Sequence, residues 1–269
     1  MKTKLKKLFP ILLILIMSLS ITACGGDSSN NDNKDQAGEQ TAFELYNAAN
    51  KLLNESDSYS ASMDTKMSMD VSGQKMDITM TAETKQETVD DSQQFEMDIV
   101  TNSMGQEMKM KAFYKDGYYY MDSSGQKMKM KMDLADAIKQ MGNTSFEIKE
   151  DAVKTQSVTD GSEGNQLTMT LDGQKIIDQA SGLLGGLDQY TAMADEMKMG
   201  DMTLTAVVGE DGNIKSTDMD FSITMTIQGQ EAAMDAKVTM DVTKIGGIKI
   251  EFPKDLDSYK ETEANAASN

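Results

Sequence analysis

Methionine thioethers are the side chains whose spacing first suggests a specific chemistry in this sequence. The chain has 25 methionines among 269 residues. Many stand two residues apart, as in Met67-Ser68-Met69, Met108-Lys109-Met110 and Met128-Lys129-Met130. Thioether sulfur is a soft ligand that suits Cu(I). The same spacing also places alternate side chains on one side of a β-strand, where methionine serves as an apolar core residue. Copper binding and core packing therefore both stay open for these groups.

Residue types that the chain lacks exclude several functions. It contains no His, no Trp and a single Cys, and its 26 basic residues are all Lys. Catalytic triads with His are thereby excluded, and so are zinc sites built from His and Cys. The formal net charge of −18 and the absence of Arg argue against nucleic-acid binding, which needs a basic surface.

The acidic residues do not suggest catalysis. Asp218 and Asp220 share one side of a predicted strand, but that side is polar and is expected to face water. Asp90-Asp91 and Glu210-Asp211 fall in predicted turns. No segment has the alternating acids, glycine and terminal Glu of a calcium loop. We therefore expect no enzyme, no catalytic residues, no metal site and no cofactor.

Cys24 is the residue for which a covalent modification is expected. Four lysines within residues 2–7 and the apolar stretch 8–19 form the basic and apolar regions of a secretory signal. The residues that follow, Ile21-Thr22-Ala23-Cys24, resemble the lipobox of bacterial lipoproteins. This resemblance implies that residues 1–23 are a signal peptide cleaved between Ala23 and Cys24. It also implies that the Cys24 thiol carries a diacylglyceryl group that anchors the protein to a membrane.

The segment after Cys24 is expected to be a tether. Residues 24–40 are rich in Gly, Ser and Asn and show no hydrophobic periodicity, so they should be disordered. Removal of residues 1–23 takes away four lysines and changes the net charge from −18 to −22. We expect an extracytoplasmic protein, lipid-anchored to the cell membrane of a bacterium of the Gram-positive type.

The elements that position these side chains follow from a change in hydrophobic period along the chain. Thr41 and Glu44 fit a capping box, and apolar residues at helical spacing predict an amphipathic helix over residues 42–54. Apolar and polar residues then alternate with period two in long runs separated by turns such as Asp116-Gly117. With weaker runs near 146–153 and 166–171, we count about eleven strands.

Helical spacing returns in three later segments, residues 134–141, 176–187 and 190–197. A large sheet with one apolar side must cover that side, so we expect the sheet to curve around these few helices. The sequence leaves open whether residues 174–199 form a mobile lid or a fixed plug.

The arrangement resembles the LolA/LppX-type superfamily of lipoproteins. Besides the lipobox, tether, helix and strands, the resemblance rests on Tyr59-Ser60, Tyr118-Tyr119-Tyr120-Met121 and Ile250-Glu251-Phe252-Pro253. Within that group the chain is more similar to Gram-positive lipoproteins of unknown function. The resemblance implies a mainly β fold with a few helices (α+β), namely a curved, unclosed antiparallel β-barrel of about eleven strands packed on short helices. Residues 41–256 would form this single half-barrel domain, and residues 257–269 a polar C-terminal tail.

The resemblance also implies that the apolar concavity binds a lipid or an acyl chain. Methionine suits such a surface because its unbranched, polarizable side chain adapts to varied apolar partners. The expected function is a surface-tethered binder, carrier or sensor of a lipid or another hydrophobic ligand. Two alternatives stay open: a non-catalytic structural or protein-interaction module with a filled core, and Cu(I) binding. The candidate ligand-lining residues are Met67, Met69, Met80, Met108, Met110, Met130, Leu183, Leu184, Met225 and Met240.

Overall fold

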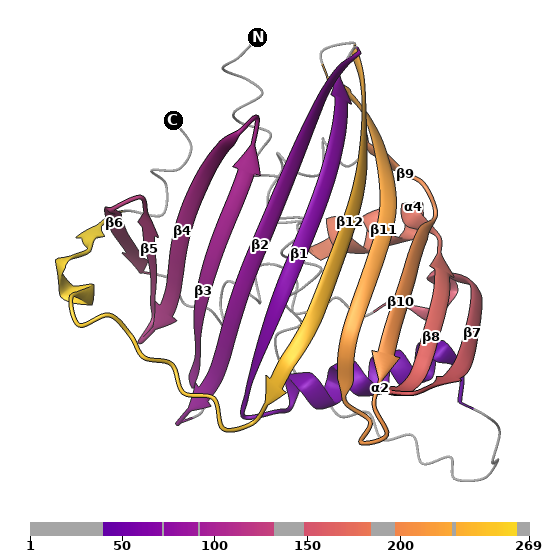
Figure 1. Cartoon of the computed structure of the whole chain (residues 1–269), viewed down its shortest axis with the longest axis horizontal. Helices are drawn as coiled ribbons and strands as arrows, with labels where there is room; N and C mark the ends of the chain where they lie inside the picture. Colours follow the sequence, from indigo (N-terminus) through magenta and orange to yellow (C-terminus); the bar gives the residue numbers. More distant parts are fainter. Residues whose placement is uncertain are drawn as a thin grey trace.

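The computed structural model describes residues 40–71, 73–90, 92–131, 148–183, 197–227 and 230–262, and the structural statements below concern these residues. Their strands form one strongly curved sheet that does not close into a barrel (Figure 1). The sheet is antiparallel except where β13 pairs with β6 in parallel. The expected mainly β fold with an unclosed, curved sheet is thus confirmed.

Within the described residues the helices are α2 (Ala42–Asn54) and α4 (Gly173–Leu183), with short 3-10 turns η1 (Glu150–Ala152) and η2 (Leu256–Ser258). The strands are β1 (Ser58–Val71), β2 (Gln74–Val89), β3 (Ser92–Ser103), β4 (Gln106–Lys115), β5 (Tyr118–Ser123), β6 (Gln126–Lys131), β7 (Val153–Gly161), β8 (Gly164–Leu171), β9 (Met197–Met199), β10 (Met202–Val208), β11 (Ile214–Ile227), β12 (Gln230–Ile245) and β13 (Lys260–Glu261). In space they follow the order β13-β6-β5-β4-β3-β2-β1-β12-β11-β10-β8-β7, with β9 beside β11. The first strand and the last long strand therefore lie side by side in the middle of the sheet.

Helix α2 has the bounds that the sequence predicts. Its capping box is present, since Glu44 N donates to Thr41 Oγ1 at 3.2 Å and Thr41 N donates to Glu44 Oε2 at 2.9 Å. Ala42, Ala49 and Leu53 are buried, in agreement with the predicted apolar stripe. The cap fixes where the helix begins, and the stripe fixes which side lies on the sheet.

Two-residue turns join the strands of the N-terminal half. Met104-Gly105, Asp116-Gly117 and Ser124-Gly125 each have two central residues with positive φ. This backbone belongs to the type I′ turn, whose twist matches that of the flanking strands. The hairpin turns predicted at these positions are confirmed, and they set the register of β3 through β6.

The count of about eleven strands is too low, because the described residues form thirteen. The strand expected near 146–153 is wrong for residues 148–152, three of which form η1. β7 begins only at Val153, and nearly every side chain on this edge strand is exposed, so its sequence shows no alternating pattern. Met197 was expected to end a helical piece but begins β9, where backbone pairing with Met225 of β11 holds it extended. Short strands and edge strands lack the half-buried periodicity on which the prediction depends.

Several predicted segments lie outside the described residues. These are the signal peptide at residues 1–23, most of the tether at 24–40, the helix at 134–141 and residues 184–196. Among the described helices, none has the length and apolar character needed to cross a membrane.

Residues 246–262 form a strap that runs below the strands from β12 to β6 (Figure 1). Thr262 N donates to Lys129 O at 2.9 Å, and Lys260 pairs with Met128. Tyr259 is buried and its ring contacts that of Tyr120 edge-on, with 5.5 Å between ring centroids. The domain boundary expected at residue 256 therefore falls inside a packed segment, and the polar tail does not begin there.

Candidate functional site

The methionines of the sheet gather on a single side, which we call the methionine face. Register places all methionines of β1–β6, β8 and β10–β12 at positions that face the helices. Cross-strand neighbours on this face include Met67 with Ile78, and Met63 with both Ala82 and Met240. The alternation read from the sequence thus has a physical counterpart, because period two in a strand puts these residues on one side.

No charged side chain occupies the methionine face in these strands. The charged residues of β1 and β2, such as Lys66 and Asp77, alternate with buried residues and point to the other side. The polar residues on the methionine face are neutral, and Thr65, Thr101 and Gln86 among them are buried. A surface of this kind binds apolar groups and neutral hydrogen-bonding groups, whereas an unpaired charge would be costly to bury there.

The candidate lining residues differ in exposure. Met67, Met80 and Met225 are buried in the core, and Met69, Met110, Met130 and Met240 are half-buried. Met108 is 49% exposed, because it lies near the β3–β4 turn at the end of its strand. The side chains of Leu183 and Leu184 lie outside the described residues, and so do Ala23 and Cys24.

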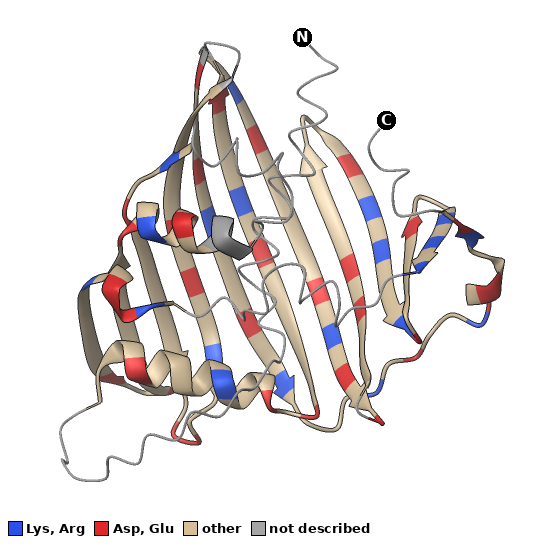
Figure 2. Cartoon of the chain, turned by 180° about the vertical axis from the view of Figure 1, so that it is seen from behind, with Lys and Arg blue, Asp and Glu red and all other residues tan. Residues whose placement is uncertain are grey.

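The described helices cover one half of the methionine face. The main contacts of α2 are with β7, β8, β10 and β11, and those of α4 are with β9 and η1. Figure 2 shows both helices over this half of the sheet, well away from β4, β5 and β6. Several methionine-face side chains of β3–β6 are only partly covered, among them Met97, Met121 and Met128, which are half-buried.

An aromatic row crosses the methionine face from β1 to β6. Its members are consecutive cross-strand neighbours: Tyr59, Gln86, Phe95, Tyr114, Tyr119 and Met130. Phe95 stacks on Tyr114 with 5.7 Å between ring centroids and meets Tyr119 at 6.2 Å. Such pairs contribute beyond the area that they bury.

The polar groups of this aromatic row make few hydrogen bonds among the described residues. Neither the Gln86 amide nor the hydroxyls of Tyr59 and Tyr119 make a hydrogen bond in the part of the chain that the structure describes. Burial raises the pKa of Tyr59 to about 12 and also raises the pKa of Tyr119. These rings and this amide are absent from the candidates chosen by sequence, although the period-two positions of Phe95 and Tyr114 could have indicated them.

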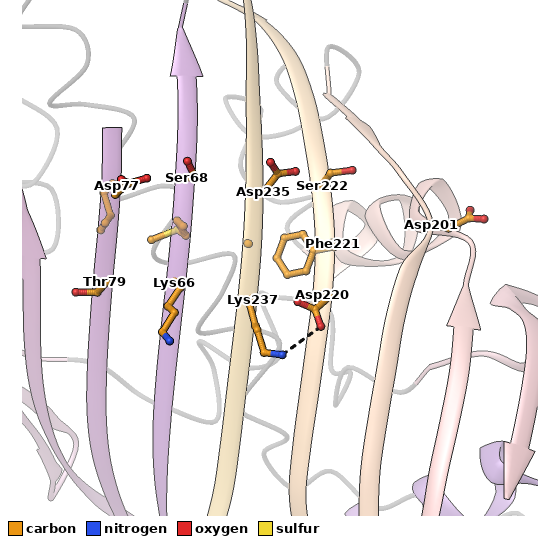
Figure 3. Close-up of a pocket in the computed structure, with 13 residues that line it drawn as sticks. Lys66, Ser68, Asp77, Thr79, Asp201, Asp220, Phe221, Ser222, Asp235 and Lys237 are labelled. Carbon is orange, nitrogen blue, oxygen red and sulfur yellow. Dashed lines mark ion pairs between the residues drawn. The ribbon is translucent and has the colours of Figure 1, made fainter. Parts of the chain in front are cut away.

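The opposite side of the sheet carries a polar groove of about 610 Å³. Figure 3 shows its residues on β1, β2, β11 and β12, with Asp201 beside them. Two cross-strand rows form its floor, Asp77–Ser68–Asp235–Ser222 and Thr79–Lys66–Lys237–Asp220. Lys237 Nζ lies 3.5 Å from Asp220 Oδ2, whereas Lys66 has no ion-pair partner among the described residues.

The groove offers little chemistry beyond solvation. Its two rows mix carboxylates with hydroxyls and amines, and no group of three or more acidic or Cys side chains in the described residues could hold a metal ion. Asp218, one of the two acids considered from sequence, accepts a hydrogen bond from Thr239 Oγ1. The methionine face is therefore the stronger candidate site.

Comparison with known proteins places the chain in a family. Residues 41–260 match a family described as of unknown function, DUF6612. The chain belongs to this family. The matched range spans the whole described sheet and reaches into the strap, in agreement with the burial of Tyr259. A comparison with curated proteins found no match.

Two of the solved structures to which this chain is similar come from mycobacteria. LprF from Mycobacterium bovis is similar with a TM-score of 0.42 and 10% identity, over 79% of this chain and 96% of LprF. The lipoprotein LppX from Mycobacterium tuberculosis is similar with a TM-score of 0.37 and 8% identity, over 78% of this chain and 98% of LppX. Both scores are low, so the description of the fold rests on the sheet itself.

Proposed function

We propose that the protein is a surface-tethered lipoprotein that binds a lipid or another hydrophobic ligand on the methionine face. The observation that carries this proposal is a face without charged side chains that crosses the sheet and that the described helices cover over one half only. Large apolar side chains gain roughly 1.5–3 kcal/mol each on full burial. The half-buried methionines of β3–β6 therefore gain free energy when an apolar partner covers them.

The chemistry of the face favours an acyl chain. Thioether side chains rearrange easily around apolar partners of different shape. The neutral polar groups of the aromatic row, on Gln86 and Tyr119, can donate hydrogen bonds to an ester oxygen and can donate to or accept from a hydroxyl group. Catalysis is not part of the proposal.

Ligand binding is tested by native mass spectrometry of the full chain after gentle extraction. We expect a co-purifying lipid mass that disappears in Met97→Lys, since a charge would then enter the uncharged face. Val100→Lys is the matched control, because Val100 lies on the same strand but on the other side of the sheet. Loss of the bound mass in both variants, or its absence from the wild type, would contradict the proposal. An interior without any bound mass would favour the alternative of an interaction module with a filled core.

The tether belongs to the same proposal. Residues 21–24 supply a lipobox pattern, and acyl chains on Cys24 would hold the domain outside the membrane of a bacterium, which we take to be Gram-positive. We expect Cys24→Ala to prevent labelling by radioactive palmitate and to leave the protein unprocessed or released. Normal processing together with unchanged membrane retention in Cys24→Ala would disprove the anchor without affecting the ligand proposal.

Cu(I) binding is the second alternative and has its own test. Pairs such as Met67 and Met69 lie two positions apart on one face, which a core also requires. Competition with bicinchoninate under reducing conditions measures the affinity directly. Tight copper binding that is lost in Met67→Leu with Met69→Leu would support it, and copper held no more tightly than by bicinchoninate would exclude it.

A further inference from the structure

The outer side of β4–β6, opposite the methionine face, carries a concentration of lysines. Figure 2 shows basic residues along β4 and β6 at the end of the sheet farthest from the helices. Residues 109–131 contain six lysines and two aspartates, in a chain whose net charge is −18. The six are Lys109, Lys111, Lys115, Lys127, Lys129 and Lys131. All share one side of the sheet, because each stands two or four positions from the next in its strand.

Three of these lysines are available to a partner. Lys109, Lys111 and Lys127 pair with carboxylates at 3.1, 2.6 and 2.5 Å. In the part of the chain that the structure describes, Lys115, Lys129 and Lys131 have no carboxylate partner. We call these three, with Tyr118 between them, the lysine patch.

Aromatic side chains alternate with the lysines of the patch. Tyr118 pairs across the strands with Lys115 on one side and Lys131 on the other. The Nζ of Lys129 lies 5.4 Å from the centroid of the Tyr118 ring, and that of Lys115 lies 4.9 Å from the Phe252 ring of the strap. The tyrosine and phenylalanine rings are half-buried, so each shows an apolar edge beside a cation.

At the end of the sheet, one side of the β5–β6 hairpin is therefore apolar and the other side is basic. One side presents half-buried Tyr119, Met121 and Met128, and the other presents the lysine patch. Beyond β6 only the two residues of β13 continue the described sheet. Tyrosine with lysines that extend past an apolar surface is the composition found where proteins meet the lipid headgroups.

We propose that the β4–β6 end of the sheet docks on an anionic lipid bilayer through the lysine patch. Anionic headgroups attract lysines close to the surface, and the attraction falls off within a Debye length. The acidic remainder of the chain is repelled by the same surface. Attraction at one end and repulsion elsewhere select one orientation, with β6 toward the bilayer and β7 away from it. The inference does not require a ligand on the methionine face.

The absence of tryptophan from the chain allows a direct test. Tyr118→Trp places one fluorophore in the patch, and Val158→Trp places one on β7 at the opposite end of the sheet, where Val158 is 36% exposed. Each full-length variant is mixed with vesicles of phosphatidylcholine, with or without phosphatidylglycerol, that carry brominated acyl chains. We expect quenching and a blue shift of the emission for Tyr118→Trp with phosphatidylglycerol only, reversed by high salt, and none for Val158→Trp.

A second variant distinguishes binding through the charges of the lysine patch from a general affinity of the protein for membranes. In Tyr118→Trp we replace Lys115, Lys129 and Lys131 by Gln, which removes each charge while keeping a flexible polar side chain. We expect severalfold weaker quenching with unchanged circular dichroism and an unchanged unfolding midpoint. Equal quenching of the two tryptophan probes, or full quenching without the three lysines, would overturn the proposal. Quenching that is equal in neutral vesicles would overturn it as well.

Discussion

Single methionines on the methionine face differ in what surrounds them, and this difference decides the effect of substituting each one. Met80 is 1% exposed and lies between Thr65 and Thr101 of the neighbouring strands, whereas Met108 on the same face is 49% exposed. Truncation of a packed side chain loses its transfer free energy and leaves a cavity. At the surface, water fills the space that the side chain leaves.

We therefore expect Met80→Ala to lower the free energy of unfolding by roughly 2–5 kcal/mol. Met80→Leu should cost less than about 1.5 kcal/mol, and the control Met108→Ala should stay within about 0.5 kcal/mol. Urea denaturation measures all three. Equal effects of Met80→Ala and Met108→Ala would show that the two sites do not differ in packing.

Tyr59 makes the free energy of unfolding depend on pH in the alkaline range. Burial raises its pKa from 10.0 to about 12 in the folded state, so folded Tyr59 keeps its proton at pH values where the unfolded chain has lost it. The corresponding stabilisation is fully present below pH 10.0 and is lost as the pH rises to about 12. We expect Tyr59→Phe to have a flatter decline of the urea midpoint across this window than the wild type. An unchanged slope would mean that Tyr59 ionises while the protein is folded.

The helices, turns and strands divide into those that a short stretch of sequence predicts and those that it does not. Helix α2 has a capping box, and the turns at Met104-Gly105 and Asp116-Gly117 have the residue types that positive φ favours. Strands with one buried side repeat every second residue, so β1, β2 and β12 could be read from the sequence. Local pattern was insufficient for β7, which lacks that repeat, and for β9, which is only three residues long and extends because of its pairing with β11.

The capping box of α2 gives a prediction at this scale. Thr41→Ala removes the hydroxyl that accepts the hydrogen bond from Glu44 N, and we expect a loss of about 1 kcal/mol in the free energy of unfolding. Thr41→Ser keeps the acceptor and should recover most of the loss. Thermal or urea unfolding followed by circular dichroism measures both variants. If serine were as destabilising as alanine, the stabilisation would come from the threonine methyl group.

Part of the candidate site could also be predicted, for a physical reason. The side of the sheet that each methionine faces follows from period two alone, as with Met67 and Met225. Its exposure depends on what packs above it, and this is why Met108 differs from Met80 although both fit the pattern. The aromatic row joins six strands, so no local window of sequence contains it. The buried contacts of Tyr259 likewise depend on the path of the strap, which no periodicity indicates.

At the scale of the whole molecule, the strap joins the centre of the sheet to its β6 end. Phe252 meets Phe113 with 6.2 Å between ring centroids, and Tyr259 contacts Tyr120. Lys127 adds an ion pair with Asp255 at 2.5 Å. These contacts bury Phe113 and Tyr120 on the outer side of β4 and β5, so the last strands of this end depend on strap residues that follow β12 in the chain.

We expect Tyr259→Ala to increase amide hydrogen exchange in β5 and β6 by an order of magnitude or more, since each 1.4 kcal/mol lost from a local opening free energy speeds exchange about tenfold. Exchange in β8 and β10 should not change, because the strap does not reach them. Mass spectrometry of peptic peptides reads both regions in one sample. A uniform increase across the sheet would show that the strap stabilises the molecule as a whole.

The pairing of β1 with β12 also bears on how the protein is made. The neighbour that flanks β1 on its other side is β12, which leaves the ribosome or a translocation channel only after β2–β11 have been made. Until β12 is made, the edge of β1 has unpaired backbone groups beside an apolar side, and another chain can pair with it. Synthesis from the N-terminus to the C-terminus therefore leaves this edge of β1 unpaired for a time that grows with every pause before residue 245.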